Sequence, residues 1–120
     1  MTTEKTFKDF EKIADFLEEQ SRNFPQAQRE VALRRAISTI YYGVFWELRQ
    51  RLRRRGIKIR KRQPHSTILK ILETNFPEIY ASMEELKKLR ELADYQEDVE
   101  ITLPMFKRAK NLARLILKGV

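Results

Sequence analysis

The chain has 120 residues, of which 42% are hydrophobic, and a net charge of +8, which fits one domain with its own core. It has no cysteine, which excludes disulfides and cysteine-based metal sites and agrees with a reducing, cytoplasmic location. No apolar run approaches the roughly 18 residues of a membrane span, and the first residues lack the apolar core of a signal peptide. We therefore expect a single domain over residues 1–120 and no membrane association.

The excess positive charge lies in one segment. The stretch RQRLRRRGIKIRKR, residues 49–62, holds nine of the 25 lysines and arginines and no acid, so the rest has 16 bases against 17 acids. Such a segment attracts phosphate groups. We predict RNA or anion binding through Arg51, Arg54, Arg55, Lys58, Arg60, Lys61 and Arg62. A basic helix end that only faces solvent is the alternative.

The N-terminal half predicts two helices. In residues 4–23 the apolar positions recur at helical spacing: Phe7, Phe10, Ile13, Ala14, Phe16 and Leu17. Pro25 suits the first turn of a second, long helix that reaches about Arg55, with Gly56 as the residue that ends it. The broad apolar face of this helix predicts a central position: Leu33, Ile37, Ile40, Tyr41, Val44, Phe45, Leu48 and Leu52.

The C-terminal half predicts three more helices: two over about residues 65–74 and 77–95, and a last one that follows Thr102 and has its inward positions up to Ile116. Pro77 opens the second of these, and Thr102 caps the third with Pro104 in its first turn. An acidic loop, residues 96–101, joins the two. The pattern therefore predicts an all-α, up-and-down bundle of four to five helices.

The stretch LRELADYQ, residues 89–96, is the first candidate site. Arg90 and Asp94 are one helical turn apart, which predicts a local ion pair. On a regular helix Tyr95 is about 140° from Arg90, so we expect these two to meet only if the helix unwinds or across a dimer interface. The only histidine, His65, is at a helix start and serves either to pack or as a general acid or base. One histidine and no cysteine predict no metal site.

Three stretches together resemble the HEPN superfamily of small helical-bundle proteins. They are RRAISTIYYGVFWELRQRL (34–52), PHSTILKIL (64–72) and LRELADYQ, followed by a final helix, and they cover about residues 32–117. The resemblance implies a bundle of four or five helices that commonly dimerises. Many members are metal-independent endoribonucleases, and others pair with a minimal nucleotidyltransferase in toxin–antitoxin modules.

The ribonucleases of this superfamily build their site between subunits from an arginine followed by a histidine. Arg90 matches that arginine, but Tyr95 occupies the histidine position. A tyrosine with a pKa near 10 is a poor base at neutral pH. His65 of either subunit is the alternative proton-transfer group. Asp94 matches a sub-group with an R-x(3)-D-Y pattern that largely lacks the ribonuclease motif.

Three hypotheses follow from these observations. The first is an RNA- or nucleotide-binding homodimer, without a cofactor, that works with a minimal nucleotidyltransferase in a toxin–antitoxin or defence module. The second is a metal-independent ribonuclease that uses Arg90, Tyr95 and His65. The third is a non-catalytic domain whose basic segment binds an acidic protein.

Overall fold

The computed structural model describes residues 4–120. Its elements are five α-helices, and this range contains no β-strand. They are α1 (Phe7–Ser21), α2 (Gln26–Arg54), α3 (Pro64–Asn75), α4 (Pro77–Tyr95) and α5 (Leu103–Gly119). The predicted all-α bundle is confirmed, and each predicted helix end differs from the observed one by at most a few residues.

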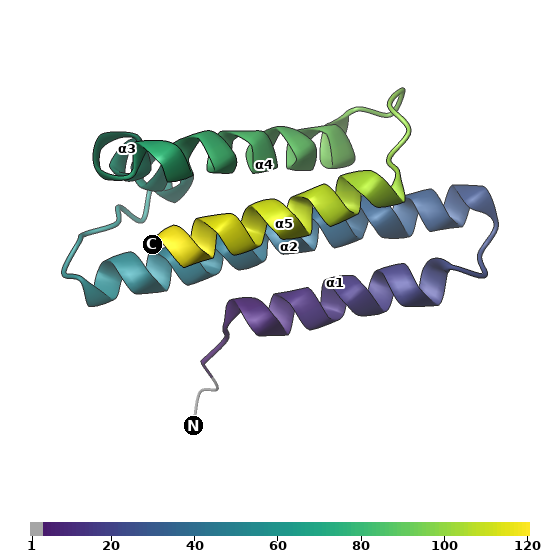
Figure 1. Ribbon diagram of the computed structural model, residues 1–120, viewed down its shortest axis with the longest axis horizontal. Coiled ribbons are helices and arrows are strands. Elements are labelled where there is room, and N and C mark those ends of the chain that lie inside the picture. Colours follow the sequence, from purple (N-terminus) through teal and green to yellow (C-terminus); the bar gives the residue numbers. More distant parts are fainter. Residues whose placement is uncertain (1–3) are drawn as a thin grey trace.

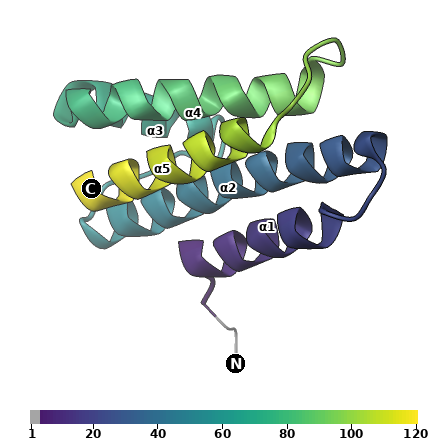
Figure 2. The ribbon, with the colours of Figure 1, turned by 45° about the vertical axis from the view of Figure 1, so that its right-hand side comes forward.

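The four long helices alternate in direction, as an up-and-down bundle requires (Figure 1). The central element is α2, which packs against each of the other four helices. The short α3 crosses one end of the bundle and packs mainly on α4 (Figures 1 and 2). None of the helices within residues 4–120 combines the length and the apolar character needed to cross a membrane.

The core is built around α2, as its apolar face predicts. All eight predicted positions on this helix are buried. They meet apolar side chains from the other helices that are also buried: Ala14, Ile68, Leu72, Met83, Leu86, Phe106, Leu112 and Ile116. Burial of this apolar surface is the main source of stability.

The helix α1 is less covered than its pattern suggests. Ile13 and Phe16 belong to its apolar series, yet each is 57% exposed. The reason is that α1 packs on α2 alone, and its links to α5 are ion pairs, Lys110 with Asp15 and Arg114 with Glu11. Only a narrow stripe of α1 therefore reaches the core.

Gly56 ends α2 as predicted. Its φ angle of 81° is in the left-handed region that favours glycine. Its N–H donates to the carbonyl of Arg53, and the N–H of Ile57 donates to that of Leu52, which is the Schellman pattern. The chain turns sharply here, so the basic loop leaves α2 and returns to begin α3.

Arg34 holds the end of α4 and the following loop against α2. Its guanidinium pairs with Glu30 and donates to the carbonyls of four residues on the other side of the interface: Leu92, Ala93, Gln96 and Val99. These carbonyls come from the last turn of α4 and the acidic loop. Arg34 therefore fixes the position of the segment that carries Asp94 and Tyr95.

Candidate nucleic-acid site

A cluster of polar and aromatic side chains gathers around Arg90, where α2, α3 and α4 meet. We call it the arginine–tyrosine cluster: Tyr41, Tyr42, His65, Arg90, Asp94 and Tyr95. The guanidinium carbon of Arg90 lies 4.8 Å from the ring centroid of Tyr41 and 5.9 Å from that of Tyr42. Both distances are within the range of a cation–π interaction. The Arg90 side chain is only 12% exposed.

His65 belongs to the same cluster through Tyr41. The Tyr41 hydroxyl is 3.1 Å from Nδ1 of His65, and the imidazole ring stacks on Phe45 with the ring centroids 3.8 Å apart. Burial and the nearby positive charges of Arg90 and Lys87 lower the pKa of His65. Burial also raises the pKa of Tyr41. At neutral pH the cluster therefore holds a neutral imidazole beside a charged guanidinium.

The ion pair predicted within LRELADYQ is present, with Nη1 of Arg90 3.8 Å from Oδ2 of Asp94. Ser38 of α2 donates to the same carboxylate at 3.3 Å. Asp94 therefore links α4 to α2 as well as to Arg90.

Our expectation about Tyr95 was wrong. The helix α4 continues through Tyr95, and Nη1 of Arg90 still lies 3.4 Å from the Tyr95 hydroxyl within one chain. The long arginine and tyrosine side chains span the angle between their positions on the helix. The contact is long for a hydrogen bond, and Tyr95 is 67% exposed.

A cleft of about 520 Å³ opens beside this cluster. It is lined by Arg35, Ser38, Tyr42, Asp94 and Tyr95, together with Val31, Arg34 and Ala93. Tyr42 is 41% exposed, so it and Tyr95 present accessible aromatic rings at the cleft. Exposed aromatic rings beside arginines are suited to stacking with nucleobases.

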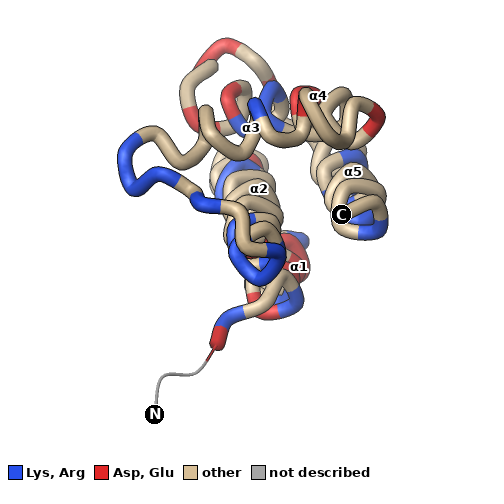
Figure 3. Tube along the Cα trace, turned by 90° about the vertical axis from the view of Figure 1, so that its left-hand side faces the viewer, with Lys and Arg blue, Asp and Glu red and all other residues tan. Residues whose placement is uncertain are grey.

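The basic segment, residues 49–62, covers the end of α2 and the loop to α3. Figure 3 shows this loop as a largely blue stretch that stands away from the helices. Six of its cations form neither an ion pair nor a side-chain hydrogen bond with another residue of the described chain: Arg49, Arg53, Lys58, Arg60, Lys61 and Arg62. These cations are therefore available to an external anion.

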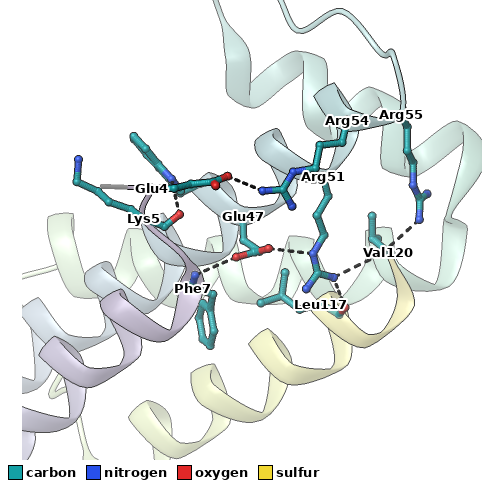
Figure 4. Close-up of polar contacts among 10 residues, drawn as sticks. Glu4, Lys5, Phe7, Glu47, Arg51, Arg54, Arg55, Leu117 and Val120 are labelled. Carbon is teal, nitrogen blue, oxygen red and sulfur yellow. Dashed lines mark hydrogen bonds and ion pairs between the residues drawn. The ribbon is translucent and has the colours of Figure 1, made fainter. Parts of the chain in front are cut away.

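The remaining three arginines of the segment have partners at the ends of the chain (Figure 4). Arg51 pairs with Glu47 and donates to the carbonyl of Leu117, and Arg54 pairs with Glu4. Arg55 donates to the carbonyl of Val120 at 3.4 Å. Arg51 and Arg55 thus help to hold the last turn of α5, so these three residues are less available for RNA than the sequence predicts.

The sequence identified Arg90, Asp94, Tyr95 and His65 as candidates, and the fold brings all four together. It did not identify Tyr41 and Tyr42 as members of the same cluster, because their position on α2 indicates only a core or interface role. The one signal in the sequence is the position of Tyr42, which is about 100° around the helix from the core residue Tyr41. This position indicates that the Tyr42 side chain faces away from the core. Within residues 4–120, no three histidine, aspartate or glutamate side chains lie close enough to hold a metal ion.

Comparisons of this chain with protein-family models, with curated proteins and with solved structures find no match. Two features of the structure are suited to binding a ligand. They are the unpaired cations of the basic segment and the arginine–tyrosine cluster beside its cleft.

Proposed function

We propose that this protein is an RNA-binding, HEPN-like domain that works with a minimal nucleotidyltransferase in a toxin–antitoxin or defence module. The observation that carries RNA binding is the set of six unpaired cations in residues 49–62. Each phosphate that such a cation neutralises releases counterions and strengthens binding. Residues 49–62 contain no acid that would offset these charges.

The class of domain is supported by where the resembling stretches fall. Residues 34–52 are in α2, residues 64–72 are in α3, and LRELADYQ forms the end of α4. The three stretches meet at the arginine–tyrosine cluster. A motif that only stabilised one helix would not need this convergence of three elements.

RNA binding is tested by titrating a labelled single-stranded RNA at several salt concentrations. Replacing Arg60, Lys61 and Arg62 by Ser should weaken the binding of unrelated RNA sequences to the same extent. The slope of log K against the logarithm of the salt concentration should become shallower by about 0.7 for each phosphate that is no longer neutralised. The matched control replaces Lys8, Lys12 and Lys88 by Ser, which removes the same charge from exposed positions elsewhere. Equal affinities of the two triple variants would refute this role of the segment.

The nucleotidyltransferase partner rests on the resemblance alone, and it is tested at the level of the operon and by co-purification. We expect the neighbouring gene to encode a minimal nucleotidyltransferase and the two products to purify as a complex. A neighbour of another class, and no complex with any such enzyme, would remove the module from the proposal and leave RNA binding standing.

A metal-independent ribonuclease is the second candidate, favoured by the contact that Tyr41 makes with both His65 and Arg90. A neutral His65 can accept the proton of a ribose 2′-hydroxyl as that oxygen bonds to phosphorus, and the imidazolium can return the proton to the 5′-oxygen as its bond to phosphorus breaks. Arg90 can stabilise charge on the phosphorane. The Nε atom of Arg90 is buried and has no hydrogen-bond partner within residues 4–120.

Cleavage of RNA in the presence of a chelator separates the two candidates. If the protein only binds RNA, we expect no cleavage above background. If it is a ribonuclease, we expect chelator-resistant cleavage that is abolished by Arg90→Ala and reduced at least about tenfold by His65→Ala or Tyr95→Phe, with folding intact. Lys88→Ala is the control, since Lys88 is exposed on the same helix.

A homodimer is the oligomeric state that we propose. Ile13, Phe16 and Tyr42 are large and exposed on α1 and α2, and aromatic side chains are enriched at interfaces. Light scattering at micromolar concentration should give twice the chain mass, and Phe16→Glu should shift it towards the monomer. A monomer mass for the unchanged protein would contradict the proposal.

A further inference from the structure

A second hollow, separate from the arginine–tyrosine cluster, lies between the basic loop and α3. It has a volume of about 530 Å³, which is within the range of small-ligand sites. Its lining contains three cations, several hydroxyl and amide side chains and no acid: Ile57, Lys58, Arg60, Gln63, Ser66, Thr67, Lys70, Ile71, Thr74 and Asn75.

The hollow faces away from His65. On an α-helix with a step of about 100°, Lys70 is about 140° and Thr74 about 180° from His65. His65 packs on Phe45 of α2, so the opposite face of α3 is the one that meets the loop. A ligand in the hollow therefore does not contact Arg90 and its neighbours.

The charges of the hollow favour a phosphate group. Lys58, Arg60 and Lys70 are exposed, and none forms an ion pair with an acid of residues 4–120. The N-terminal end of α3 adds a partial positive charge, because Gln63 makes no capping bond with its side chain. The apolar part of the lining, Ile57 and Ile71, lies at the edge of the core.

The cationic surface of the hollow continues on the other side of the loop. A smaller hollow of about 200 Å³ is lined by Arg49, Arg53, Ile59, Arg60, Lys61 and Pro64. Arg60 lines both hollows. A phosphate chain that crosses Arg60 would therefore meet cations continuously from the end of α2 to Lys70 on α3.

We infer that the larger hollow seats one nucleotide of a single-stranded RNA, with its phosphate on Lys58, Arg60 and Lys70 and its base against Ile57 and Ile71. This inference rests on the proposed RNA binding and specifies its geometry. A single strand can turn one nucleotide out of its path, whereas a duplex holds its bases stacked and paired. The protein therefore prefers single strands, and α3 forms part of the RNA site.

Two variants test the hollow itself. Lys70→Gln removes a cation that lies outside residues 49–62, and Ser66→Trp fills the hollow without changing the charge. For Lys70→Gln we expect about fivefold weaker binding at 0.1 M salt and a salt slope shallower by about 0.7, which is the single-strand value for one phosphate contact. Ser66→Trp should cost at least as much, because it excludes the whole nucleotide.

Matched controls are Lys12→Gln on α1 and Ala81→Trp on α4, both at exposed helical positions outside the hollow. Both should bind RNA as the unchanged protein does. A duplex of the same length should compete at least several-fold less well than the single strand. Thermal melting, monitored by circular dichroism, should show all four variants folded.

The outcomes separate this inference from the proposed function. If Lys70→Gln and Ser66→Trp bind like their controls while the Arg60, Lys61 and Arg62 triple variant binds weakly, the hollow is not the seat and RNA binding stands. If the duplex competes as well as the single strand, the seating of one nucleotide is wrong. If the unchanged protein shows no salt-sensitive binding of single-stranded RNA, the proposed function and this inference both fail.

Discussion

The Tyr41 hydroxyl and Nδ1 of His65 are 3.1 Å apart, and this contact joins the start of α3 to the middle of α2. The Tyr41 ring also makes a cation–π contact with Arg90, whose guanidinium carbon lies 4.8 Å from the ring centroid. One buried tyrosine thus connects the only histidine of the chain to the arginine of the LRELADYQ stretch. The protonation state of His65 must therefore affect both packing and the charge around Arg90.

The stability of the protein should fall as His65 becomes protonated. Its pKa in the folded protein is lowered by burial and by Arg90 and Lys87, whereas the unfolded chain has the ordinary value of about 6.5. Below pH 6.5 the unfolded state binds the proton more readily than the folded state. The contribution of His65 is thus fully present above pH 6.5 and is lost as the pH falls through the folded pKa.

This dependence is measurable because the chain has no other histidine. Urea unfolding between about pH 7.5 and pH 5 should show a steeper loss of stability for the unchanged protein than for His65→Gln. An NMR titration of the imidazole should have its midpoint below 6.5. A midpoint at or above 6.5, or identical pH profiles for the two proteins, would contradict the prediction.

Arg90→Ala should lower the free energy of unfolding by about 0.5–2 kcal/mol. The substitution removes the guanidinium from the rings of Tyr41 and Tyr42 and breaks the ion pair with Asp94. The Nε atom limits the loss, since it makes no hydrogen bond within residues 4–120. Urea unfolding measures the effect, with Lys88→Ala as an exposed control within about 0.5 kcal/mol of the unchanged protein.

Tyr95→Phe should be nearly silent in the same measurement. The hydroxyl that it removes lies 3.4 Å from Arg90 in an exposed contact, and Tyr95 is 67% exposed, so its loss leaves no buried donor without a partner. A loss for Tyr95→Phe as large as that for Arg90→Ala would mean that the tyrosine hydroxyl orients the arginine.

The helices could be predicted from the sequence because their signals are local. The apolar period of α2 and the end signal at Gly56 each depend on a few neighbouring residues. The exposure of Ile13 and Phe16 could not be predicted, because it depends on how much of α1 the other helices cover. A helical period shows that an apolar face exists and does not show how wide a partner surface it meets.

The candidate site was predictable in part for a related reason. Arg90, Asp94 and Tyr95 are close in the chain, so one motif contains them. Tyr41 and His65 join them only through the packing of α2, α3 and α4. In the same way, the partners of Arg51 at Glu47 and Leu117 combine a local ion pair with a tertiary contact, and only the first is visible as a spacing in the sequence.

Arg34→Ala should destabilise the end of α4 and the acidic loop. The guanidinium donates to carbonyls of Leu92, Ala93, Gln96 and Val99, and hydrogen bonds of charged groups each contribute about 1.5–3 kcal/mol when they are sheltered from solvent. We expect a loss of about 2 kcal/mol in urea unfolding and faster hydrogen exchange in residues 92–102. Arg35→Ala on the exposed side of α2 is the control, and equal effects at the two positions would contradict this role of Arg34.

Gly43→Ala should destabilise the protein, although alanine forms helices better than glycine by about 1 kcal/mol. A Cβ atom at this position would be 2.6 Å from Cβ of Phe10 and 3.1 Å from Cδ1 of Phe7, so α1 must move away from α2. Overpacking of this kind typically costs about 1–3 kcal/mol, and we expect a net loss of about 1–2 kcal/mol in urea unfolding. Because α1 packs on α2 alone, hydrogen exchange should become faster in α1 before the rest of the bundle.

Gln50→Ala, which is on α2 and outside this contact, should change stability by less than about 0.5 kcal/mol. A Gly43→Ala protein as stable as the unchanged one, with α1 still protected, would show that close approach of the two helices at Gly43 is not required.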